Sequence, residues 1–300
     1  MSTIKKVNMK KVGLVNWAIF LLLSFIWGSS FVLMKEGLVG LTSYQVASLR
    51  IVFSGIVLLP YSIKYWKQLP SNKMGTIFLS GLLGSLLPAF LFCVAEEKID
   101  SSLAGTLNSL TPIFVILIGA VFFNTKTSAN KIIGIIIAVV GCALLLFSKN
   151  SLQQNQPVFY VSLVIVATIC YGINVNMVSK YLKNIGSIQL AAVALGLNAI
   201  PALIILFFTG YFNLPLTDSK VLSSTLYTAL LGIFGTALAS ITFYLLMKRA
   251  GAIFASMVTY GIPFVAIMWG ILYGEKIGIK QLVALSIILV GVYIANRKIK

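Results

Sequence analysis

The chain has 300 residues, of which 59% are hydrophobic and only 10% charged, and its mean hydropathy is +1.01. This composition excludes an ordinary soluble domain and predicts a helical membrane protein. A transmembrane β-barrel is excluded as well, because the apolar runs are continuous rather than alternating.

The chain begins with a polar stretch, residues 1–13, that carries four lysines. The apolar run that follows continues to about Met34. It is too long for a typical signal peptide, lacks an obvious cleavage site and precedes further apolar runs, so we interpret it as a retained first helix.

Ten apolar segments have about the 20 residues that a helix needs to cross ~30 Å of hydrocarbon. In chain order, the predicted spans are 14–34, 44–63, 74–94, 101–123, 131–148, 158–179, 187–209, 224–247, 252–273 and 279–296. The longest loop, around 210–223, is a turn-rich connector. We therefore expect an all-α membrane protein with ten transmembrane helices.

The charges indicate an orientation. With both termini in the cytoplasm, cytoplasmic segments hold 16 basic residues and no acidic one, while the opposite side holds six basic residues and all six carboxylates. This bias predicts a multi-pass protein of the plasma (inner) membrane with both termini cytoplasmic. The net charge of +17 is then mainly a topology signal that can also attract anionic membrane lipid. We expect no nucleic-acid partner, because no folded domain offers a basic face.

The sequence repeats itself at an offset of 151 residues, so that 81–113 resembles 232–264. The matching pairs are Gly81 and Gly232, Gly84 and Gly235, Phe92 and Phe243, Ala104 and Ala255, and Pro112 and Pro263. The halves 1–149 and 150–300 each hold five predicted spans, and an odd number of spans inverts the second half relative to the first. Two inverted five-helix repeats are typical of membrane transporters.

Pro263 is followed by Glu275, Ile277, Gln281 and Gly291 near the end of the chain. This pattern resembles the EamA repeat of the drug/metabolite transporter (DMT) superfamily. The first span, with 27–31 reading WGSSF, and Arg50 in the second span are similar to that family too. The resemblance implies ten helices in two inverted repeats and a cavity between them lined by spans one, three, four, six, eight and nine. The first half has Thr125 where the second has Glu275.

Polar side chains inside spans are costly when they face lipid. Each could make an interhelical hydrogen bond worth about 0.6 kcal/mol, but as a set they favour a shared polar cavity. Trp27 and Tyr171, at matching places in spans one and six, could stack on a ligand or gate the cavity. The candidate substrate-binding residues are Trp27, Ser30, Asn108, Tyr171, Asn174, Thr236, Thr259 and Tyr260.

Three further residues have two open interpretations. Pro112 and Pro263 break helices at equivalent places, which indicates either gating kinks that line a cavity or static kinks. Arg50 lies in the second span, where it either anchors a carboxylate or locks the structure internally, or else snorkels to the interface. Small residues form a stripe at every fourth position of the third span and of its equivalent, which favours close helix packing: Gly81, Ser85 and Ala89, with Gly232, Thr236 and Ser240.

Several kinds of chemistry lack their residues. The chain has no histidine, and no Asp or Glu lies well inside a predicted span, which argues against a membrane-embedded enzyme. An outer-surface site at Glu96, Glu97 and Asp100 is the weakest alternative. No GxxxxGK[ST] pattern supports ATP hydrolysis. The three cysteines have no metal-like spacing, so we expect neither metal nor cofactor.

The sequence thus predicts a transporter, not an enzyme, that exports or facilitates movement of a small polar metabolite such as an amino acid, without ATP hydrolysis. The alternative is a non-transporting membrane scaffold or lipid-binding protein. A transporter requires Trp27, Asn108, Asn174 and Tyr260 to converge on a cavity, whereas a scaffold would leave them facing lipid or a dry core.

Overall fold

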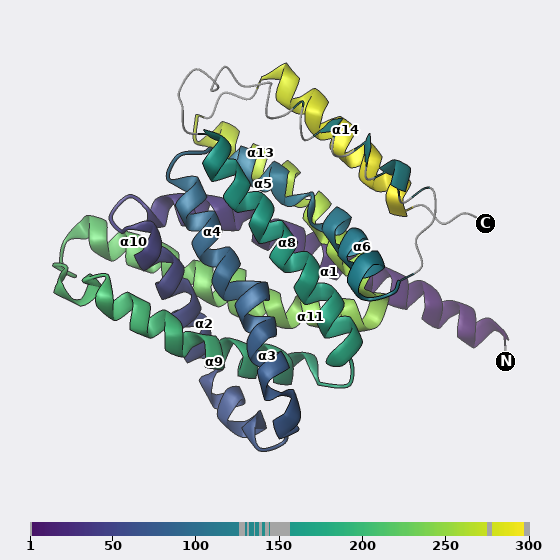
Figure 1. Cartoon of the computed structure of the whole chain (residues 1–300), viewed down its shortest axis with the longest axis horizontal. Coiled ribbons are helices and arrows are strands. Elements are labelled where there is room, and N and C mark those ends of the chain that lie inside the picture. Colours follow the sequence, from purple (N-terminus) through teal and green to yellow (C-terminus); the bar gives the residue numbers. More distant parts are fainter. Residues whose placement is uncertain are drawn as a thin grey trace.

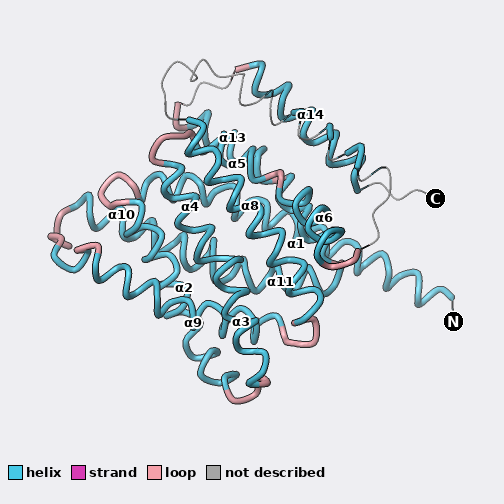
Figure 2. Tube along the Cα trace, in the orientation of Figure 1, coloured by secondary structure: helices cyan, strands magenta, loops and turns pink. Residues whose placement is uncertain are grey.

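The computed structural model describes residues 2–125, 157–274 and 278–296, with isolated positions between 130 and 144, and describes side chains from residue 13 onward. Within those residues the regular structure is entirely helical (Figures 1 and 2). Long helices lie side by side, and Figure 2 shows most of the connecting loops gathered at the ends of the bundle.

The α-helices of the first half are α1 (Ser2–Gly37), α2 (Ser43–Trp66), α3 (Met74–Gly81), α4 (Leu87–Glu96), α5 (Ser101–Asn108) and α6 (Thr111–Phe122). Those of the second half are α8 (Pro157–Tyr181), α9 (Ser187–Phe208), α10 (Ser219–Leu230), α11 (Ala239–Ala250), α12 (Ala252–Ser256), α13 (Ile262–Leu272) and α14 (Ile279–Asn296). Shorter elements join them: η1 (Ser71–Lys73), η2 (Leu82–Leu86), η4 (Tyr211–Asn213), η5 (Leu231–Leu238) and η6 (Met257–Tyr260).

Eight helical stretches of the described chain are long and apolar enough to cross a membrane. They are 13–37, 43–66, 71–96, 101–122, 158–181, 187–208, 219–250 and 252–272, and they coincide with eight of the ten predicted spans. The tenth prediction falls on α14, whose apolar part is the shorter stretch Leu282–Gly291. The fifth, 131–148, lies largely outside the described residues, as does Glu275.

Hydrogen bonds between a loop residue and the first turns of a helix define the two ends of the bundle. Gly40 N donates to Ser224 Oγ at 3.0 Å, which joins the end of α1 to the start of α10. We call this end the Gly40 side. At the other end Gln189 Nε2 donates to Gln68 Oε1 at 3.4 Å, which joins the start of α9 to the end of α2. We call this end the Gln68 side. Helix α1 runs toward the Gly40 side and α8 toward the Gln68 side, so these two helices run in opposite directions.

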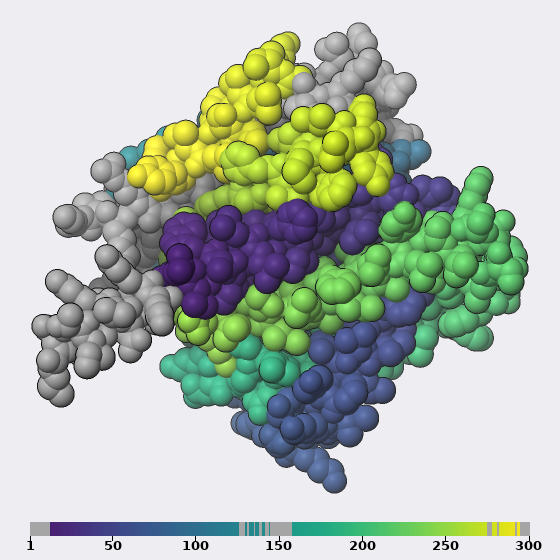
Figure 3. Space-filling view, turned by 180° about the vertical axis from the view of Figure 1, so that it is seen from behind, coloured from purple at the N-terminus to yellow at the C-terminus, as the bar shows by residue number. Residues whose placement is uncertain are grey.

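The halves contact one another reciprocally. Helix α1 packs on α11 and α13 of the second half, and α8 packs on α4 and α6 of the first. Figure 3 shows the purple α1 lying between the yellow-green C-terminal helices and the green α10 and α11. Each half's first helix therefore lies against the other half's third and fourth predicted spans.

Gly81 and Gly232 each permit a close helix crossing. A Cβ at Gly81 would collide with Asn198 Nδ2 and lie 2.6 Å from Ala194 O, both on α9. A Cβ at Gly232 would lie 2.6 Å from Arg50 O on α2. The small-residue stripe thus packs the third span of each half directly on the second span of the other.

The outer surface of the bundle is apolar. Phe208 and Phe122 are 81% and 72% exposed, which would be unfavourable in water but suits a surface covered by lipid. Trp17, near the start of the apolar stretch 13–37, and Trp66, at the end of α2, are about half exposed, as expected for interfacial belt residues.

Candidate functional site

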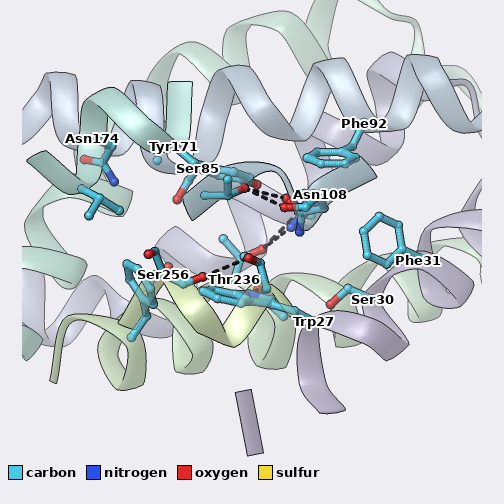
Figure 4. A pocket seen from close by; sticks show the side chains of 18 of the residues that line it. Trp27, Ser30, Phe31, Ser85, Phe92, Asn108, Tyr171, Asn174, Thr236 and Ser256 are labelled. Carbon is cyan, nitrogen blue, oxygen red and sulfur yellow. Dashed lines mark hydrogen bonds between the residues drawn. The ribbon is translucent and has the colours of Figure 1, made fainter. Parts of the chain in front are cut away.

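A cavity lies between the two halves, where polar side chains of both converge (Figure 4). It holds about 880 Å³ of non-protein space, including the part that opens to solvent. Its lining residues are Trp27, Ser30, Phe31, Met34, Arg50, Gly84, Ser85, Phe92, Asn108, Thr111, Tyr171, Asn174, Val175, Gly235, Thr236, Ser240, Phe243, Tyr244, Ser256 and Thr259. Seven of the eight candidate substrate-binding residues are among them.

The eighth candidate, Tyr260, is not part of the lining and packs against the apolar core instead. It follows Thr259, which does line the cavity. Neighbouring residues on a helix point in directions about 100° apart, and here Thr259 faces the cavity while Tyr260 packs on the core.

Two aromatic pairs occupy equivalent places in the halves. Trp27 of α1 packs on Phe243 of α11 with ring centroids 5.3 Å apart, and Tyr171 of α8 packs on Phe92 of α4 at 6.2 Å. Phe92 and Phe243 are themselves related by the 151-residue offset. Each pair joins the first helix of one half to the third span of the other, and all four rings line the cavity.

The π-helical segment η5 receives two polar side chains from the first half. Trp27 Nε1 donates to Gly235 O at 3.1 Å, and Arg50 donates through Nη2 to Thr236 Oγ1 at 3.1 Å. A π-helical turn shifts the local hydrogen-bond register, and such turns occur often at functional sites. The equivalent region of the first half is also π-helical, in η2, so both halves interrupt their third span beside the cavity.

The predicted helix breaks are present, but the two prolines do not line the cavity. Pro112 and Pro263 lie at the starts of α6 and α13, where proline is well tolerated, and both are buried outside the cavity. The first break instead presents Asn108 and Thr111, with Thr111 Oγ1 donating to Asn108 Oδ1 at 3.2 Å. The two prolines are therefore not among the lining residues, and a gating role of the two breaks stays a prediction.

Hydroxyl groups add acceptors to the wall. Ser30 Oγ donates to Ile26 O at 2.8 Å, and Thr259 Oγ1 donates to Ser256 O at 2.9 Å. Each hydroxyl donates its hydrogen to a nearby backbone carbonyl and keeps lone pairs that can accept a hydrogen bond from a ligand.

Asn174 packs against a glycine of the cavity wall. It faces Gly84, at which a Cβ would collide with Asn174 Nδ2. Tyr244, which also lines the cavity, has its hydroxyl 3.1 Å from Ser80 Oγ. The Asn174 Oδ1 atom is buried without a hydrogen-bond partner.

The described part of the cavity wall carries positive charge only. Among the described lining residues Arg50 is the only charged side chain, and none carries a carboxylate. A site of this kind favours a solute that brings at least one negative charge or acceptor group, and disfavours simple cations.

Several lining residues escaped the sequence interpretation. Ser85 and Ser240 belong to the stripe read as packing, and Ser256 and Thr111 each lie three residues from a predicted site residue. Helical spacing was the available signal for Ser240, Ser256 and Thr111, and the 151-residue repeat, which matches Ser85 with Thr236, was the signal for Ser85. Conversely, Asn176 is structural, since its Nδ2 donates to Val115 O and Gly172 O, each at 2.8 Å.

Comparison with known proteins follows the same division into halves. A family model described as the EamA-like transporter family matches residues 16–147 and 158–297. An uncharacterized transporter of Archaeoglobus fulgidus is 28% identical over 94% of this chain and 99% of its own length. The uncharacterized transporter YdfC of Bacillus subtilis is 24% identical over 81% of this chain and 78% of its own.

The protein PagO of Salmonella typhimurium is 22% identical over 95% of this chain and 93% of its own length. One solved crystal structure covers 94% of this chain and 96% of its own, with a TM-score of 0.67 at 16% identity. That likeness is one of fold.

Proposed function

This chain belongs to the EamA-like transporter family, and from that premise we propose that it moves a small polar metabolite, such as an amino acid, through the cavity between its halves. It is a multi-span membrane protein of a transporter family. The proposal adds that it exports or facilitates movement of the solute without ATP hydrolysis, and that it is not an enzyme.

One observation carries the proposal: polar and aromatic side chains from both halves meet at one cavity. Trp27, Asn108 and Asn174 lie there rather than toward lipid, which supports a transporter over a scaffold. We assign substrate contact to the seven predicted residues of the wall, and Arg50 to holding an acidic group.

A transport cycle follows from the arrangement of the halves. We propose that 1–149 and 150–300 are inverted repeats of five spans each. The opposite directions of α1 and α8, and the reciprocal contacts of the halves, support this. Rocking of one repeat against the other would open the cavity alternately to the two sides, with the breaks at Pro112 and Pro263 as hinges.

We further propose that the Gln68 side faces the cytoplasm, together with both termini, in the plasma (inner) membrane. Its helix ends and loops carry Lys67, Lys73, Lys183 and Arg249 among other basic residues, whereas carboxylates such as that of Asp218 lie on the Gly40 side. Short loops rich in lysine and arginine are retained on the cytoplasmic side of the membrane. Their basic residues also suit contact with anionic lipid.

The test begins in cells with and without the protein, by comparing intracellular and extracellular metabolites. Solutes that shift toward the medium are then loaded into proteoliposomes, and their efflux is compared with that from protein-free liposomes. Protein-dependent efflux of a small polar solute without ATP supports the proposal. A broad metabolite panel from which no solute moves would refute it.

A further inference from the structure

Arg50 ties the two halves together at one point of the cavity wall. Its guanidinium donates two hydrogen bonds from the first half to the second, from Nε at 3.3 Å and from Nη2 at 3.1 Å, and Thr236 Oγ1 accepts both. Thr236 is only 4% exposed, and its own hydroxyl donates to Leu231 O at 3.4 Å. Hydrogen bonds from a charged donor are stronger than those between neutral groups. We call the two bonds the Arg50–Thr236 latch.

The latch lies where α2 crosses η5. A Cβ at Gly232, in η5, would lie 2.6 Å from Arg50 O, so the backbones of the two elements are already in close contact. A movement of one half against the other at this crossing must stretch or break the two bonds, because the donor and the acceptor belong to different halves. The latch therefore fits one relative position of the halves and opposes the others.

The described residues of the equivalent crossing, between the third span of the first half and α9, form no such latch. Gly81 meets α9 in the same way, with a new Cβ 2.6 Å from Ala194 O. Ala194 thus stands where Arg50 stands, and its methyl group cannot donate a hydrogen bond. The residue that matches Thr236 at the 151-residue offset is Ser85. Both crossings therefore carry a hydroxyl group, but only one carries a guanidinium.

The two crossings also differ in helix register. Gly232 lies inside the π-helical η5, whereas Gly81 is the last residue of the α-helix α3, and the π-helical η2 begins after it at Leu82. Equivalent segments of the two halves thus hold two different conformations in one structure. Exchange of these conformations between the halves is what rocking of inverted repeats predicts.

We propose that the Arg50–Thr236 latch holds the empty transporter in the conformation of this structure, and that the opposite conformation lacks the latch. This inference rests on the proposed function, in which the halves rock, and adds an unequal balance between the two end states. Symmetric repeats alone would leave the two conformations close in free energy, so charged hydrogen bonds at one crossing determine which conformation is populated. We expect a bias of at least about tenfold, which corresponds to about 1.4 kcal/mol.

The test measures from which side of the membrane the empty cavity can be reached. Ser85→Cys places a thiol in the cavity wall, in the full-length protein with Cys93, Cys142 and Cys170 replaced by alanine. A membrane-impermeant maleimide is applied to intact cells and, separately, to inverted membrane vesicles, and the two labelling rates are measured by mass spectrometry. Lys98→Cys, made separately in the exposed loop between α4 and α5, is the control for access of the reagent and should react equally with and without the latch.

Thr236→Val removes the hydroxyl at nearly equal volume. It should change the two labelling rates of Ser85→Cys in opposite senses and shift their ratio by at least about tenfold. Thr236→Ser keeps the hydroxyl and should retain the ratio of the unchanged latch. Arg50→Met keeps a long side chain without its donors, and should give the same shift if Thr236→Val fails to fold. Because the two residues act as one pair, the double variant should shift the ratio no further than either single variant.

The outcomes separate the latch from transport. Two labelling rates that rise together in Thr236→Val would indicate a loosened bundle instead of a shifted balance, and would overturn the latch. An unchanged ratio, or shifts that add in the double variant, would overturn it as well, and all three results leave the proposed function intact. A Ser85→Cys thiol that reacts from neither side in any variant would overturn the proposed function and this inference together.

Discussion

Replacing Gly81 with alanine should loosen the contact of α3 with α9. The new Cβ would collide with Asn198 Nδ2 and lie 2.6 Å from Ala194 O, a backbone atom that cannot turn away. If the Asn198 side chain moves, its bonds to Phe78 O and Ala194 O are lost, at about 1 kcal/mol each. If the helices separate instead, overpacking costs about 1–3 kcal/mol.

The measurement is the apparent melting temperature of the purified protein in detergent, followed by size-exclusion chromatography. We expect a drop of several degrees for Gly81→Ala and a comparable drop for Gly232→Ala, whose Cβ would lie 2.6 Å from Arg50 O. The control is Gly75→Ala on the same helix, where no atom lies within 4 Å of the new Cβ. That variant should be neutral or slightly stabilising.

Equal melting temperatures for Gly81→Ala and Gly75→Ala would refute the reasoning, because the two changes differ only in what surrounds the new methyl group. A drop for Gly81→Ala without one for Gly232→Ala would contradict the equivalence of the two crossings.

Three further outcomes follow from the structure. Arg50→Gln should abolish efflux of carboxylate-bearing solutes while Arg50→Lys retains part of it, measured in liposomes; equal rates for both variants and wild type would contradict the anchoring role. Trp27→Phe should lose the bond to Gly235 O but keep the packing on Phe243, lowering stability by about 1 kcal/mol; an unchanged melting temperature would count against that bond. Thr42→Ala should remove the capping box at the start of α2, at about 1 kcal/mol, with efflux per folded protein unchanged; lost efflux would give this cap a functional role.

Hydropathy predicted the spans well because their length and composition alone determine them. The segment 101–123, for example, coincides with the helical stretch 101–122 although a break at Pro112 divides it. The repeat matched Phe92 with Phe243 in the sequence. In the structure each of these two residues forms an aromatic pair with the first helix of the other half.

The sequence did not predict which face of each helix points toward the cavity. Asn174 and Asn176 are two residues apart and chemically identical, yet one faces the cavity and the other bonds to Val115 O. The packing of α8 on its neighbouring helices decides which of the two asparagines faces the cavity, and no local sequence pattern indicates this. The same applies to Thr259 and Tyr260, and to the π-helical turns, whose register depends on tertiary contacts.

The central claim is that solute passes through the cavity between the halves, and a plugged cavity tests it most directly. Ser85→Trp would fill the cavity from η2, whereas Leu79→Trp places the same side chain on the exposed face of the neighbouring helix α3. With equal folding verified by size-exclusion chromatography, efflux from proteoliposomes should be lost in Ser85→Trp and retained in Leu79→Trp. Efflux that is equal in the two variants would contradict the account.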